Sequence, residues 1–353
     1  MQSVKILTTT SKKFTRHGEP AKYQEGLYQL SSNAYAWMVP NGSWGETNIG
    51  LVDCGGKSVL IDTCWDLHYA QEMLNGLAPV ISRSPVEVVI NTHSDGDHCW
   101  GNQLFKSKEI IATNACLQQI DHVKPGSLNA IKRCCGPLSH VPVAAIDKYF
   151  RYMDEMLKPY QFADVELTRP SHSFNGEYSC EINGIEIVVM EVGPAHTNGD
   201  AFVFLPQQKV VYAGDVAFIN STPVMWSGPV ENLLAALHKL LALNADTIVP
   251  GHGPLGGAAE IQRIIDYWQF VQEQIHHRFQ KDMTPYEAAY DLMLSSEFRS
   301  QPFAQWGEAE RLLTNTYSLY RHWGARLANL PGPLGIMDVL RQQAKLAYSK
   351  AMS

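Results

Sequence analysis

Short apolar runs and longer amphipathic stretches divide the chain into two β-rich parts, each followed by helical segments. Short alternating or continuous apolar runs bounded by Asn, Gly and Ser are typical of strands, whereas apolar positions on one face of a longer run indicate a helix. In the first part these patterns predict strands at residues 26–30, 34–39, 48–52, 58–61 and 86–90, and a helix at 67–77.

The second part begins with a predicted strand at 110–112 and a mainly helical segment at about 116–162. Further strands are predicted at 185–191, 201–204, 210–212 and 247–249, with a helix at 231–243. From about 258 the pattern is helical to the end, with breaks near Pro285 and at 330–333. Two β-rich halves with helices around them indicate an α/β layered architecture of two packed sheets.

Four aromatic residues in the helical tail are spaced so that they could share one helical face. They are Trp306, Tyr317, Tyr320 and Trp323. Such a face could belong to the core or to a dimer interface, and the spacing leaves both open, so a homo-oligomer also stays open.

Composition narrows the class of protein. The chain has 353 residues, of which 45% are apolar and 18% charged, as in ordinary globular proteins. A net charge of -7 argues against nucleic acid as a partner, because phosphate binding needs a basic face. Neither a signal peptide nor a long apolar membrane segment is visible, and the seven cysteines contain no Cys-x-x-Cys pair. We therefore expect a cytoplasmic protein that acts without a membrane.

The segment His93-Ser-Asp-Gly-Asp-His98 directly follows the predicted strand at 86–90 and holds four side chains that can bind a metal. A strand end followed by a tight turn can aim such side chains at one point, and Gly96 is expected to permit the bend. Because Asp and His are also common in turns, this segment alone leaves an ordinary turn open.

Three later segments repeat this form, with a ligand-type side chain beside the end of a predicted strand. His196 lies in a turn before the strand at 201–204, and Asp215 follows the strand at 210–212. His252 lies between two glycines after the strand at 247–249. Taken singly, each is an ordinary turn residue, but together they favour a metal site.

The order of these residues resembles the signature of the metallo-β-lactamase superfamily, His-x-His-x-Asp-His followed by a His, a bridging Asp and a final His. The strand-end pair Asp62-Thr63 adds to the resemblance, which covers about residues 25–260. It implies an αββα sandwich with two metal ions at one edge of the sheets. We expect a catalytic domain at 1–280, a helical insertion at about 116–162 that caps the site, and a helical C-terminal extension at 281–353.

The resemblance also implies which residues bind each metal. The first metal would be bound by His93 and His196, and the second by Asp97, His98 and His252. Asp215 would bind both. We expect Asp97 and Asp215 to be the catalytic residues. The cofactors implied are two divalent ions, with zinc as the first expectation and iron or manganese as alternatives, because histidine and carboxylate ligands suit all three.

Asp95 departs from the signature, since it stands where the family has its second histidine. A further carboxylate would lower the Lewis acidity of the first metal and favour iron or manganese over zinc. The flavodiiron branch of the family has Glu at the equivalent place, but Asp is one methylene shorter. Whether Asp95 ligates therefore stays open, and we carry it as a seventh candidate ligand.

The function expected from the resemblance is hydrolysis of a small-molecule ester, lactone, thioester, amide, phosphate ester or sulfate ester by a metal-bridging hydroxide. Asp95 suggests a di-iron oxidoreductase as the second reading, although the chain has no flavodoxin-like part. A metal-bearing ligand sensor with little turnover is the third. The sequence does not name the substrate.

Overall fold

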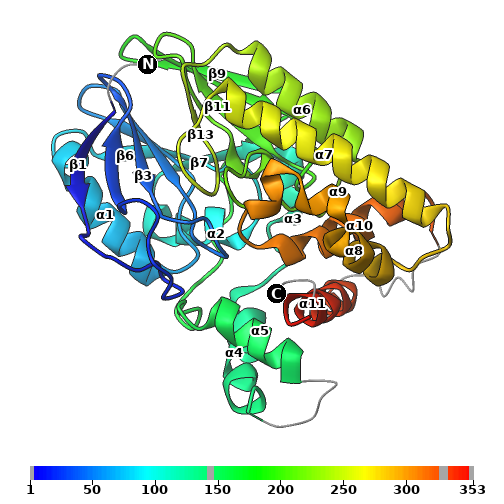
Figure 1. The fold of residues 1–353 in the computed structure, drawn as a ribbon. Helices are drawn as coiled ribbons and strands as arrows, with labels where there is room; N and C mark the ends of the chain where they lie inside the picture. Colours follow the sequence, from blue (N-terminus) through cyan, green and yellow to red (C-terminus); the bar gives the residue numbers. More distant parts are fainter. Residues whose placement is uncertain (1–3, 141–146, 326–332, 350–353) are drawn as a thin grey trace.

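The computed structural model describes residues 4–140, 147–325 and 333–349, and it consists of two sheets with helices outside them (Figure 1). This confirms the predicted αββα sandwich with its helical insertion and helical C-terminal extension. The predicted break at 330–332 lies outside the described residues, and α11 begins at Pro333.

The first sheet has eight strands in the described part of the chain, and they neighbour one another in chain order. They are β1 (Lys5–Thr9), β2 (Gly26–Gln29), β3 (Ala34–Met38), β4 (Ile49–Asp53), β5 (Ser58–Ile61), β6 (Val86–Ile90), β7 (Glu109–Thr113) and β8 (His172–Phe174). Neighbours are antiparallel from β1 to β5 and parallel from β5 to β8. The carboxyl ends of β5 and β6 therefore meet at one edge.

The second sheet has the strand order β13-β12-β11-β10-β9. Its strands are β9 (Glu177–Ile182), β10 (Ile185–Glu191), β11 (Ala201–Leu205), β12 (Val210–Tyr212) and β13 (Thr247–Val249). Only β12 and β13 run parallel among these described pairs. Buried side chains such as Val52 and Ile61 from the first sheet and Val189 and Val203 from the second form the core between the two sheets.

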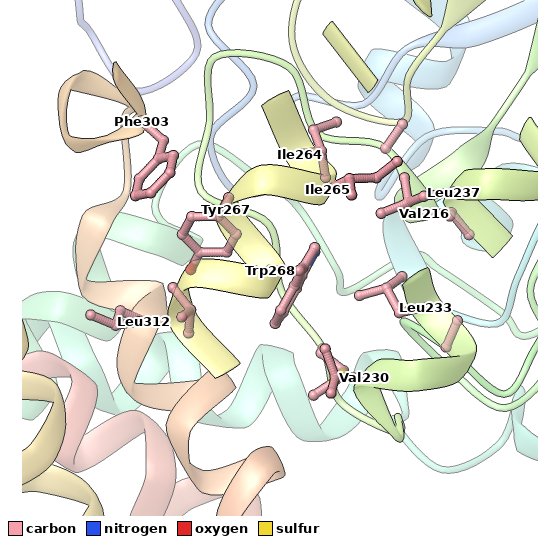
Figure 2. Close-up of a cluster of buried hydrophobic side chains, with 14 of the residues drawn as sticks. Val216, Val230, Leu233, Leu237, Ile264, Ile265, Tyr267, Trp268, Phe303 and Leu312 are labelled. Atoms are coloured by element: carbon pink, nitrogen blue, oxygen red, sulfur yellow. The ribbon is translucent and has the colours of Figure 1, made fainter. Parts of the chain in front are cut away.

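Helices cover the outer faces of both sheets. Helix α1 (Leu67–Ile81) buries Met73 and Leu77 against the first sheet. Helices α6 (Val230–Ala242) and α7 (Ala258–Phe279) cover the second (Figure 1). Figure 2 shows the fully buried Trp268 of α7 facing Val230 and Leu233 of α6. Burial of such large apolar surfaces is the main stabilising contribution to this part of the fold.

The insertion and the tail lie together beside the sandwich. The insertion contains α3 (Asn114–Gln119), α4 (Pro125–Leu138) and α5 (Asp147–Leu157), and the tail contains α8 (Pro285–Leu294), α9 (Ser296–Arg299), α10 (Leu312–His322) and α11 (Pro333–Ala347). Helix α11 lies alongside α5 (Figure 1), and Gln343 Nε2 donates a hydrogen bond to Tyr152 Oη at 2.7 Å. Segments almost 200 residues apart are thus joined into one layer.

The tail aromatics do not share one helical face. Trp306 lies before α10, after the short 3-10 helix η3 (Pro302–Gln305), and its ring contacts that of Tyr267 at 5.6 Å. Tyr320 and Trp323 pack against Phe279 of α7 at 5.0 and 5.4 Å. The core alternative therefore accounts for these three aromatic residues. These contacts join residues on both sides of position 280. The boundary between the predicted catalytic domain and the predicted C-terminal extension therefore stays a prediction.

Three strands were not predicted from the sequence. In β1 no residue is fully buried, and in β9 exposed residues, among them Glu177 and Glu181, alternate with half-buried ones. β8 has only three residues. Such strands lack the apolar run that identifies a buried strand. Among the described helices, none combines the length and the apolar content that crossing a bilayer requires.

Candidate metal centre

The six residues expected as ligands converge at the edge where the strands of both sheets end. His93 follows β6, and His98 lies in the short helix α2 (Gly96–Cys99) just beyond it. Asp215 lies in the 3-10 helix η2 (Gly214–Val216) after β12, and His252 follows β13. The fold thus brings together residues up to 159 positions apart, from 93 to 252.

These residues form two groups of three, and within each group the candidate ligand atoms lie within 4.8 Å of one another. The groups are His93, His196 and Asp215, and Asp97, His98 and His252. Each has the donor types that bind zinc, iron or manganese in proteins, imidazole nitrogen and carboxylate oxygen.

Asp215 belongs to the first group and also faces the second. Its Oδ1 is 3.1 Å from His98 Nε2, and its Oδ2 is 3.4 Å from His196 Nε2. The same Oδ2 is 3.5 Å from His252 Nε2 and 3.8 Å from His93 Nε2. A carboxylate that faces the Nε2 atoms of both groups has the position that a bridging ligand requires.

The Nδ1 atoms of all four histidines are held by partners on the outer side of the cluster. The partners are Thr92 Oγ1 for His93 at 3.0 Å, Asp62 Oδ2 for His98 at 2.8 Å, Val224 O for His196 at 2.7 Å and Glu46 O for His252 at 3.1 Å. Carbonyl and carboxylate oxygens only accept, and the Thr92 hydroxyl donates its own proton to Asp62, so these contacts assign the ring proton to Nδ1. The lone pair of each neutral ring is then on Nε2, which faces the site.

Asp62 at the end of β5 links both groups. Its Oδ1 accepts a hydrogen bond from the backbone N–H of Thr92, and its Oδ2 accepts one from Thr92 Oγ1, both at 2.7 Å. Thr92 in turn accepts from the ring of His93, while Asp62 accepts from His98 directly. The sequence pointed to Asp62-Thr63 as a family feature but did not assign this role.

The cluster fits a bound cation. His93 Nε2, His98 Nε2 and Asp215 Oδ1 are buried and have no hydrogen-bond partner among the described residues. Burial lowers the pKa of His93 to about 4, which keeps its ring neutral. Burial alone would raise the pKa of Asp215, but His252 and His98 hold it well below its ordinary value. Buried polar groups are normally paired, so these imidazole nitrogens and this carboxylate oxygen, left without partners, are the donors expected of a metal site.

Asp95 and Asp97 differ in position. Asp97 Oδ2 accepts a hydrogen bond from Thr47 Oγ1 at 2.8 Å and lies 3.4 Å from His252 Nε2. Asp95 Oδ2 lies 3.1 Å from His196 Nε2, with 35% of its side chain exposed, and it belongs to neither group of three. Asp95 therefore lies next to the first group but is not one of its three candidate ligands.

The expected role of Gly96 was wrong. Gly96 begins α2 and has no positive φ, so the backbone does not need glycine for its conformation. A Cβ there would instead lie 2.6 Å from the ring of Trp100 and 2.9 Å from Trp65 Nε1. Close packing of the two indoles against the backbone is what requires a glycine.

A cavity of about 630 Å³ opens beside the metal groups. The insertion contributes Leu128 and Met156 to its wall, and α11 contributes Ile336 and Leu340. The insertion therefore borders the cavity, as expected. The C-terminal tail forms the apolar wall of the cavity together with the insertion. Pockets of this size, mainly apolar with a few polar groups, are typical of small-molecule sites.

Two residues that border this cavity were missed by sequence reasoning. The ring of Phe218 stacks on that of His252, with centroids 5.0 Å apart and planes at 6°. Arg311 is buried at 1% exposure and lies in the 3-10 helix η4 (Ala309–Arg311). Neither stands in a motif, so only the fold could bring them to the site.

Comparison with known proteins identifies the family. A sequence model of the metallo-beta-lactamase superfamily matches residues 42–126 and 136–252, more than half of the chain. The linear primary-alkylsulfatase of Pseudomonas sp. (strain ATCC 19151) is 23% identical in an alignment 309 residues long that covers 77% of this chain and 55% of that protein. The beta-lactamase-like protein 2 homolog of Caenorhabditis elegans is 23% identical over 238 residues, 67% of this chain and 63% of that one.

A solved structure supports the fold. A double mutant of the sec-alkyl sulfatase PisA1 superposes with a TM-score of 0.63 at 16% identity, covering 92% of this chain and 55% of that chain. The chain thus spans between 55% and 63% of the length of these three proteins. From the family match, the two-sheet fold and the converging residues, the chain belongs to the metallo-beta-lactamase superfamily.

Proposed function

We propose that the chain is a dinuclear metal-dependent hydrolase that cleaves an ester-type bond of a small organic molecule. The observation that carries this proposal is the position of Asp215 between two groups that each hold two histidines. The first metal is assigned to His93 and His196, the second to Asp97, His98 and His252, and Asp215 to both. Zinc is the expected metal, with iron or manganese as alternatives.

Two divalent cations would supply Lewis acidity that activates water and polarises the bond to be cleaved. The chain's own groups prepare the site for this. The four Nδ1 contacts hold the rings in place, which limits the reorganisation needed during reaction. Asp97 borders the cavity, and its hydrogen bond from Thr47 fixes a carboxylate beside the position of the substrate.

The substrate class proposed is that of the sequence analysis: an ester, lactone, thioester, amide, phosphate ester or sulfate ester. The names of the alkylsulfatase relatives favour a sulfate ester within this class. The apolar wall formed by the insertion and α11 supports an organic chain as part of the substrate. A cytoplasmic location remains part of the proposal, supported by seven cysteines that form no disulfide; a homo-oligomer remains open.

A di-iron oxidoreductase is the second candidate, because Asp95 adds a carboxylate 3.1 Å from His196 Nε2. Iron in the purified protein, with a spectrum that changes between anaerobic and aerated samples, would favour it. Zinc, with no change on aeration, would favour the hydrolase.

A substrate panel tests the hydrolase. Metal-loaded protein is assayed on an alkyl sulfate, an alkyl phosphate, a carboxylate ester and a lactone, with Asp215→Ala as the control. We expect turnover of at least one class that both chelation and Asp215→Ala abolish. Folded, metal-loaded protein that turns over none of them would contradict the proposal.

A further inference from the structure

Arg311 is a buried cation with unused hydrogen-bond donors. Only 1% of the residue is exposed. Its Nη1 donates to Ser221 Oγ at 3.1 Å and to the carbonyl oxygen of Thr222 at 3.2 Å. Its Nε is buried and has no hydrogen-bond partner within the described ranges.

No described carboxylate forms a salt bridge with Arg311. The adjacent Glu310 is buried as well, but its Oε1 accepts a hydrogen bond from Tyr152 Oη at 2.9 Å instead. The guanidinium lies over the ring of Trp44 at 4.6 Å and that of Phe218 at 5.7 Å. Burying an unpaired charge is unfavourable, and aromatic faces offset only part of that cost. An anion from outside the chain would complete the pairing.

The position of Arg311 places that anion in the substrate cavity. Arg311 borders the same cavity as Asp97 and His252. One of the two aromatic rings beside its guanidinium, Phe218, is the ring that stacks on His252. One aromatic side chain thus separates the guanidinium from a candidate ligand of the second metal.

The rest of the cavity suits an apolar group. Leu128 and Met156 from the insertion and Leu340 from α11 border it, together with Trp65 and Trp100 near the metal groups. A molecule with one anionic group and an apolar chain would match both features of the cavity.

We propose that Arg311 is a substrate-binding residue that holds an anionic oxygen of the ligand, so that the site selects anionic amphiphiles over neutral ones of equal length. That the ligand is a substrate rests on the proposed hydrolase function, whereas the binding preference does not. The guanidinium offers a planar set of donors that matches an oxyanion.

The neighbouring Arg321 provides a matched control. It also borders the cavity, but its Nη2 already donates to the carbonyl oxygens of Trp226 at 2.5 Å and Ser227 at 3.2 Å. It is exposed to solvent, so its charge is hydrated. Its removal should therefore affect anion binding much less than removal of Arg311.

The test is isothermal titration of the metal-loaded full chain with decyl sulfonate, which carries no cleavable ester, and with decanol. We expect the wild type to bind the sulfonate more tightly. Arg311→Gln should weaken sulfonate binding roughly 10- to 100-fold and leave decanol binding unchanged, the usual range for a hydrogen bond to a charged group. Arg311→Lys should recover part of the loss, and Arg321→Gln should change sulfonate binding by less than about 3-fold.

Three results would overturn the assignment: a wild type that does not prefer the sulfonate, a folded Arg311→Gln protein with unchanged sulfonate binding, or an equal loss for both ligands. If Arg311→Gln does not fold, the wild-type preference and Arg311→Lys decide the question. Sulfonate selectivity that depends on Arg311, without turnover of any ester, would support this binding role while contradicting the hydrolase.

Discussion

His98 Nδ1 donates a hydrogen bond to Asp62 Oδ2 over 2.8 Å, which ties a candidate ligand of the second metal to the end of β5. The same oxygen accepts a hydrogen bond from Thr92 Oγ1, and Thr92 holds the ring of His93. One buried carboxylate thereby orients a histidine in each metal group. Contacts of this kind set ligand orientation and basicity, and they are the chain's own contribution to metal affinity.

Replacing Asp62 by Asn should weaken metal binding without removing a ligand. An amide has one acceptor oxygen and an NH2 group, so it cannot accept at both positions as Asp62 does now. We expect the apparent metal affinity to fall roughly 10- to 100-fold, measured by competition with a chelator. The control is Asp53→Asn, which removes the charge paired with the exposed side chain of Arg83 and leaves the candidate ligands in place. Equal affinities in Asp62→Asn and wild type would contradict the orienting role.

Single ligand removals should separate the two metals. His98→Ala and His252→Ala should each empty mainly the second site, and His196→Ala mainly the first, because the two groups have no histidine in common and are linked through Asp215. Asp215→Ala should weaken both. Anomalous difference maps of each variant crystal would show which site remains filled. Loss of a single metal in Asp215→Ala, with the other at full occupancy, would refute the bridge.

The sequence predicted the sandwich and the six converging residues because each candidate ligand stands near the end or the start of an apolar strand, where local pattern is strong. It could not predict contacts set by the packing of distant segments. Asp62 and His98 are 36 positions apart, and Arg311 follows His252 by 59 positions without any motif. Gly96 was predicted to permit a backbone bend, whereas two tryptophan rings leave no room for a larger side chain there. β9 was missed because exposed residues alternate with half-buried ones.

Asp95→His tests the departure from the family signature. Asp95 lies beside the first group, 3.1 Å from His196 Nε2, and removing its negative charge should increase the Lewis acidity of the first metal. Zinc occupancy should rise relative to iron or manganese, and the acidic limb of any pH–rate profile should shift to lower pH, because bound water becomes more acidic. Elemental analysis measures the first effect. Unchanged metal preference would mean that Asp95 acts only through its contact with His196.

The insertion should control substrate binding more than metal binding, because it contributes cavity wall and no ligand. Leu128 and Leu138 both lie in α4, but only Leu128 borders the cavity, while Leu138 is 37% exposed. Leu128→Ala should raise KM for a long-chain substrate roughly 3- to 10-fold through lost apolar contact. Leu138→Ala should leave KM unchanged, and both should keep wild-type metal content. Metal loss in folded Leu128→Ala would show that the insertion supports the metals as well.

The central claim is that the two groups around Asp215 hold two metal ions. Elemental analysis of protein purified without chelators, combined with protein concentration from amino-acid analysis, tests it most directly. The account predicts about two transition-metal ions per chain, removable by chelation and restored by zinc, manganese or iron. Folded protein that contains no metal, and takes up none when incubated with each of these ions, would contradict it.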